Sequence, residues 1–181
     1  MYDMARNLSG MMIYSEHRYY GFSTPTPDLT LENMQYLNID QALADLAHFI
    51  VNIKEKFPEV KNSKVILVGC SYSGTMVTWF LQKYPHLAQG AWSMSAPLKA
   101  KVDFVEYLET VSKAIHDIGG ATCSNKIRNA FVQMEDLWKN KNLTEIKRIF
   151  RLCQPLNDTN TLDVWNLFGD MGSAWSGIVQ S

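Results

Sequence analysis

Residues 65–74, VILVGCSYSG, predict a sharp turn between a strand and a helix. The first four residues form a continuous, largely β-branched apolar run, which is typical of a parallel strand covered on both faces. Ser71 follows closely, and a helix is expected from there to Tyr84. Its apolar stripe consists of Met76, Val77, Phe80 and Leu81. A serine between a buried strand and a helix is the context that a nucleophile elbow requires.

Small residues surround this serine, as a strained turn needs. Gly69 precedes it by two positions, but Ser73 stands where the G-x-S-x-G pattern has its second glycine. The amides at the start of the following helix favour nearby negative charge, so the backbone N–H of Tyr72 is a candidate oxyanion donor. The alternative is that Ser71 only caps the helix, since serine is a common cap. Spacing alone leaves the two interpretations open.

A second polar stretch, residues 16–21 (EHRYYG), follows a short apolar run at 11–14 that we predict to be a strand. Such residues could line a pocket at the carboxyl ends of parallel strands. The alternative, which composition favours, is that Tyr19 and Tyr20 are half-buried packing residues and Arg18 pairs with a carboxylate.

The remaining pattern divides near residue 100. Before it, residues 39–51 carry the apolar face of a helix that begins at Asn38, with Gln41 as a capping-box partner, and residues 91–94 read as a third strand. After it, apolar residues at helical spacing predict successive helices over 104–115, 127–138, 146–150 and 162–168, with Gly119 and Gly120 ending the first. The expected fold class is α/β, followed by an all-helical lobe.

Composition excludes several functions. The 181 residues have a formal net charge of −1 and no lysine or arginine cluster, so neither a nucleic-acid partner nor an anionic membrane surface is expected. No stretch reaches the roughly 20 apolar residues of a membrane span, and the first residues do not form a signal peptide. No metal or organic cofactor is indicated. Asn142 and Asn157 lie in sequons and are candidate glycosylation sites, as is Asn7 more weakly.

Three motifs, taken together, resemble a known family in order and spacing. Residues 16–21, residues 36–50 and residues 69–74 resemble the prolyl carboxypeptidase, dipeptidyl peptidase II and thymus-specific serine protease family. Residues 123–124 and 152–156 are similar to landmarks of its helical cap lobe. The resemblance implies that residues 1–100 are part of an α/β-hydrolase domain and that residues 101–181 are part of the cap. It also implies a secreted or lysosomal serine exopeptidase that cuts short peptides, often next to proline.

Carried over to this sequence, the family's elbow falls on residues 69–74 and makes Ser71 the nucleophile. Gly69 and Gly74 match the family, whereas Cys70 and Ser73 stand where it has glycine. We expect Cys70 to be inert, since a buried free cysteine usually is. The resemblance leaves Cys123 and Cys153 either bridged to each other or paired with residues elsewhere.

The triad of this fold runs Ser, Asp or Glu, His along the chain, and no histidine follows His116. His17, His48 and His86 precede or closely follow the elbow. The resemblance therefore implies a fragment that lacks the triad aspartate and histidine and has little peptidase activity alone. Two alternatives stay open: a non-catalytic protein of this fold that binds peptides or a partner, and an esterase or lipase.

Overall fold

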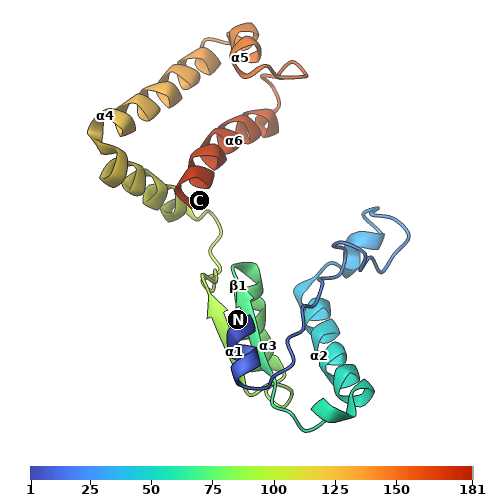
Figure 1. Cartoon of the computed structure of the whole chain (residues 1–181). Helices are drawn as coiled ribbons and strands as arrows, with labels where there is room; N and C mark the ends of the chain where they lie inside the picture. The colour runs from blue at the N-terminus through green and yellow to red at the C-terminus, as the bar shows by residue number, and fades with distance from the viewer. Residues whose placement is uncertain (181) are drawn as a thin grey trace. The chain divides into compact units, whose positions relative to one another are not determined.

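The computed structural model describes residues 1–180. The chain forms two compact units, which divide between Ala100 and Lys101 (Figure 1). All the strands of the described residues lie in the first unit, and the second unit is helical.

The first unit is a small parallel sheet with flanking helices. Its helices are α1 (Tyr2–Asn7), α2 (Ile39–Lys56) and α3 (Tyr72–Lys83), with 3-10 turns η1 (Asn33–Tyr36) and η2 (Pro58–Val60). Strand β1 (Ile66–Cys70) pairs in parallel with β2 (Gly90–Met94), and α3 is the connection between them. These two strands and the helices α2 and α3 confirm the predicted α/β pattern.

The core of this unit lies between α2, α3 and one face of the sheet. Phe80 of α3 is fully buried there, and Leu67 of β1 points into the same cluster. The other buried members are Leu43, Ala47, Ile50, Val77 and Ala88. The expectation that β1 is covered on both faces is wrong for the described residues. Ile66 and Val68 are exposed, because both helices pack against the face that carries Leu67.

Two local predictions have different outcomes. Asn38 caps α2 as predicted, and its Oδ1 accepts a hydrogen bond from the Gln41 amide at 2.9 Å. The predicted strand at residues 11–14 is absent, and these residues are exposed and irregular. A strand needs a hydrogen-bonded neighbour, and the described residues pair only β1 with β2. An apolar run without a partner is therefore not a strand.

The second unit consists of α4 (Val105–Lys139), α5 (Leu143–Phe150) and α6 (Thr161–Gln180). Gly120, with φ 75° and ψ 174°, divides α4 into two helices that meet at a kink, as predicted, because glycine adopts this non-helical conformation without a steric penalty. Its small core is formed by Met134, Ile146 and Leu167. No helix among residues 1–180 is long and apolar enough to span a membrane.

Candidate active site

Ser71 is the single residue between β1 and α3, and its backbone is strained. Its φ of 56° and ψ of −128° lie in a region that residues with a side chain rarely occupy, at a cost of about 1–3 kcal/mol. Its N–H donates to the Met94 carbonyl at 2.9 Å, and its carbonyl accepts from the Thr75 amide at 3.2 Å. These two hydrogen bonds tie the turn to β2 and to the first turn of α3, and the Ser71 side chain is exposed.

The turn is tight enough to require glycine at two positions. A Cβ on Gly69 would lie 2.2 Å from the Ser73 carbonyl oxygen, and a Cβ on Gly74 would lie 2.9 Å from the Met94 carbonyl oxygen. Both partners are backbone atoms, so neither can move without opening the turn. Cys70 and Ser73, the two departures from the family pattern, are exposed. The elbow therefore keeps glycine at the positions where a side chain would collide.

The expectation that Cys70 is buried is wrong. Its position on β1 alternates with the buried residues Leu67 and Gly69, so it faces the uncovered side of the strand. Cys123 and Cys153 are also exposed free thiols, so the structure contains no bridge between them.

Ser71 is at the N-cap position of α3, yet its side chain makes no capping hydrogen bond. Within residues 1–180 its hydroxyl makes no hydrogen bond. Tyr72 is the first residue of α3, and amides of a first turn have no partner inside the helix. Ser71 thus directly precedes the N-terminal, positive end of the α3 dipole.

A compact loop of residues 16–23 forms the second part of the site. Tyr19 and Gly21 both have positive φ, and the Tyr19 N–H donates to the Ser23 carbonyl at 2.9 Å. The Glu16 carboxylate accepts from the Ser23 hydroxyl at 2.6 Å and from the Phe22 amide at 3.0 Å. These bonds lower the pKa of Glu16, the Ser23 hydroxyl contributing most. Gly21 has no room for a Cβ because Glu16 fills that space.

Arg18 fixes this loop to α2. Its guanidinium makes a two-point ion pair with Asp45, with N–O distances of 2.6 and 2.7 Å, and donates to the Tyr36 carbonyl at 2.8 Å. The hydrogen bond with Asp45 raises the pKa of Arg18. Arg18 also donates to the side chain of Gln41, and the Asn38 amide donates to the Tyr36 carbonyl at 3.0 Å, so the second hydrogen bond of the predicted capping box is absent. Arg18 thus pairs with a carboxylate, as the packing interpretation predicted.

The loop and the elbow meet at a small pocket. It is lined by His17 and Tyr20 from the loop, by Tyr72 from α3, and by Leu37, Asn38 and Ile39 at the start of α2. The His17 ring lies 5.3 Å from the Tyr20 ring and 5.9 Å from the Tyr72 ring. Burial, and secondarily Tyr20, raise the pKa of Tyr72. A pocket lined by residues 16–21 was the less favoured interpretation of the sequence, and Leu37, Asn38 and Ile39 were not predicted to line it.

The other candidate residues lie elsewhere. His116 of α4 is 3.1 Å from the Ser124 hydroxyl, the His86 ring contacts Tyr84, and His48 is exposed on α2. Asn142 and Asn157 are exposed, and the side chain of Asn142 caps α5. The described part of the chain contains no cluster of side chains suited to a metal ion.

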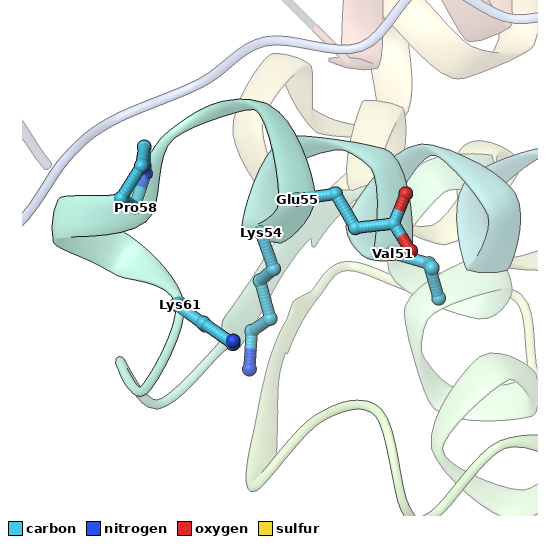
Figure 2. A pocket seen from close by; sticks show the side chains of 5 residues that line it. All are labelled: Val51, Lys54, Glu55, Pro58 and Lys61. Carbon is cyan, nitrogen blue, oxygen red and sulfur yellow. The ribbon is translucent and has the colours of Figure 1, made fainter.

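A second, open hollow lies at the other end of α2, where the chain turns at Pro58 (Figure 2). It is lined by Val51, Lys54, Glu55, Pro58 and Lys61. Its polar groups are those of an ordinary solvated surface, so it is not a candidate active site.

Sequence comparison identifies the class of protein that has this site. Residues 1–181 match the family described as serine carboxypeptidase S28. The chain therefore belongs to this family of serine peptidases, and the resemblance predicted from its three motifs is confirmed.

Individual relatives agree with the family. The chain is 34% identical to "Lysosomal Pro-X carboxypeptidase" of Mus musculus over 91% of its length and 35% of the relative's. It is likewise 34% identical to the protein of that name in Bos taurus, over 98% and 36%. "Probable extracellular serine carboxypeptidase" of Arthroderma benhamiae is 36% identical over 83% of the chain and 22% of the relative. The chain thus spans about a third of the length of the first curated relatives it matches.

Proposed function

We propose that this chain carries the nucleophile of a serine-type exopeptidase and that Ser71 is that nucleophile. The observation that carries the proposal is the backbone of Ser71. Its strained φ and ψ place an exposed hydroxyl without a hydrogen-bond partner at a strand-to-helix turn. A serine that only capped the helix would make a side-chain bond to α3, and Ser71 makes none.

The chemistry follows from the neighbours of this oxygen. The Ser71 oxygen attacks the scissile carbonyl carbon while its proton passes to a general base, and the carbonyl oxygen becomes an oxyanion beside the Tyr72 N–H. The C–N bond then breaks, the base returns the proton to the leaving amine, and water hydrolyses the acyl-enzyme. Because Ser71 has no partner within residues 1–180, we assign the base and its acidic partner to residues outside that range. The described chain alone would then have little activity.

The finer assignments rest on the family and its named members. Two relatives are named Pro-X carboxypeptidases, which supports short peptides with proline next to the cleaved bond as substrates. The word "Lysosomal" in these two names and "extracellular" in the name of the Arthroderma benhamiae relative support a lysosomal or secreted location. In this proposal residues 1–100 belong to an α/β-hydrolase domain and residues 101–181 to its helical cap.

Active-site labelling tests the proposal directly. Cells that express the tagged gene are treated with a biotinylated fluorophosphonate, and the enriched protein is digested to identify the labelled peptide. We expect the label on Ser71, none in Ser71→Ala, and full labelling in the neighbouring exposed control Ser73→Ala. The mass of the labelled protein separately tests whether the chain is part of a longer enzyme.

Other results would favour the alternatives. A folded protein that is abundant but never labels would support non-catalytic peptide binding. A labelled protein that hydrolyses acyl esters but not prolyl peptides would support an esterase.

A further inference from the structure

Two side-chain hydroxyls join the first turn of α3 to residues 93–97, which end β2 and continue past it. The Ser93 hydroxyl donates to the Gly74 carbonyl at 2.9 Å. The Thr75 hydroxyl donates in the opposite direction, to the Pro97 carbonyl at 3.2 Å. These bonds supplement the backbone hydrogen bond that already joins the elbow to β2. The segment and the helix are therefore linked at both ends of the segment.

The 93–97 segment bends at a strained residue. Ser95 directly follows β2 and has a φ of 48°, much as Ser71 directly follows β1 and has a φ of 56°. The two strands pair in parallel, and their last residues are register partners, so both serines leave the sheet at the same edge. Such backbone strain persists only where surrounding contacts impose it, and it clusters at functional sites. The hydrogen bonds at Ser93 and Pro97 lie on either side of this bend.

Neither hydroxyl is the only donor within reach of its acceptor. The Gly74 carbonyl also accepts from the Thr78 hydroxyl at 2.9 Å, a bond made entirely within α3. Pro97 is an exposed residue, where water is available as another donor. The contribution specific to Ser93 and Thr75 is therefore the link between α3 and the segment after β2.

This link acts on the part of α3 that carries the candidate oxyanion donor. Tyr72 is the first residue of α3, and Gly74 and Thr75 belong to the same turn. An oxyanion is stabilised only by donors at hydrogen-bond distance from the point where its charge develops. A misplacement of about 1 Å can lower the rate of a reaction about 100-fold. A small shift of this turn should therefore affect attack by Ser71 more than it affects folding.

We propose that Ser93 and Thr75 are positioning residues, whose hydroxyls hold the Tyr72 N–H where the oxyanion of the acyl-transfer step develops. The proposal rests on the function proposed above, since it takes Ser71 as the nucleophile. In this role neither hydroxyl touches the substrate, and each acts through the backbone of the first turn of α3.

The rate of fluorophosphonate labelling at Ser71 tests this role in the tagged gene product. We expect Ser93→Ala and Thr75→Val each to lower the maximum labelling rate about tenfold and to leave the half-saturating probe concentration unchanged, because the oxyanion contact forms only in the transition state. Thr78→Val is the matched control, since it removes the other hydroxyl from the Gly74 carbonyl without breaking the link to β2. An equal loss of rate in Thr78→Val would overturn the proposal.

Two replacements of Thr75 separate positioning from stability. Thr75→Ser keeps the hydroxyl but removes a methyl group from a fully buried residue, so it should lower the midpoint of urea denaturation. Thr75→Val keeps the shape and removes the hydroxyl. We expect Thr75→Ser to label within about twofold of the unmodified protein, despite its lower stability, and Thr75→Val to label about tenfold more slowly. A labelling rate that followed stability instead would show a purely structural role and refute the proposal.

The Tyr72 amide provides a measurement that needs no catalysis. In NMR spectra of the 181-residue chain, its resonance should move in Ser93→Ala and in Thr75→Val and stay in place in Thr78→Val. An unmoved resonance in the first two variants would overturn the proposal. Absence of labelling at Ser71 in the unmodified protein would instead refute the proposed function, and the amide shifts would still show whether the two hydroxyls place this N–H.

Discussion

The two parts of the site, the elbow at Ser71 and the loop of residues 16–23, are held in place by different interactions. The elbow at Ser71 is fixed by the backbone, through the contacts that exclude a Cβ at Gly69 and Gly74. The loop of residues 16–23 is fixed by side chains, through Glu16 within the loop and Arg18 from the loop to α2. A backbone turn depends on the sizes of a few adjacent residues, whereas the loop depends on partners far along the chain.

The elbow and the loop should therefore respond differently to substitution. A side chain added to the turn would collide with backbone atoms. The resulting strain cannot be relieved by a small adjustment, because the neighbouring strand and helix would have to move. Loss of one side chain from the loop removes hydrogen bonds but leaves room for rearrangement and for water. Substitutions in the elbow should therefore cost more than substitutions in the loop.

The largest effect is expected from Gly69→Ala. Its Cβ would lie 2.2 Å from the Ser73 carbonyl oxygen, so we expect a loss of about 3 kcal/mol in the free energy of unfolding. Fluorophosphonate labelling of Ser71 should disappear with it. Urea denaturation followed by circular dichroism measures the stability. Gly177→Ala on α6 is the control, since its Cβ meets nothing within 4 Å. Equal stability of the two variants would mean that the turn is not held by this close approach.

Arg18→Met should have the next largest effect, a loss of about 2 kcal/mol in the free energy of unfolding. The Arg18 side chain is 14% exposed and that of Asp45 is 51% exposed, so burial of the guanidinium only partly shields its hydrogen bonds to Asp45 and to the Tyr36 carbonyl from water. Arg148→Met is a matched control, because Arg148 makes the same two-point pair with Glu145 but is 71% exposed. We expect it to change stability by about 0.5 kcal/mol or less. Similar losses of stability in Arg18→Met and Arg148→Met would show that burial does not set how much the Arg18–Asp45 ion pair contributes.

The same contrast explains what could be predicted from the sequence. The elbow and the start of α2 were predictable because each depends on adjacent residues: small ones around Ser71, and Asn38 with Gln41 three positions on. The strand expected at 11–14 failed because pairing depends on a neighbour that an apolar run cannot specify. The lining of the pocket was not predictable for a similar reason, since Leu37 and Ile39 share a pocket with Tyr72 only in the folded chain.

Acidification should loosen the loop selectively. Hydrogen bonds from Ser23 and Phe22 lower the pKa of Glu16 below its usual range of about 4.3. Their support is therefore complete above the ordinary carboxyl pKa and is lost as the pH falls through the lowered value. Amide exchange at Tyr19 and Ser23, measured relative to the elbow amide of Ser71, should accelerate below about pH 4. Glu16→Gln should remove this pH dependence. An unchanged profile in that variant would assign the effect to another group.

The smallest effect is expected from Ser73→Gly, which restores the second glycine of the G-x-S-x-G pattern. Ser73 is exposed, so its Cβ is not what the turn must avoid, and glycine only adds backbone freedom near the start of α3. We expect the midpoint of urea denaturation to correspond to a loss of about 0.5 kcal/mol or less, with full labelling of Ser71. Gly74→Ala is the opposing variant, because its Cβ would lie 2.9 Å from the Met94 carbonyl oxygen, and it should cost clearly more. A gain of about 1 kcal/mol in Ser73→Gly would instead show that the serine strains the elbow, because removing a Cβ stabilises a residue only where that Cβ is crowded.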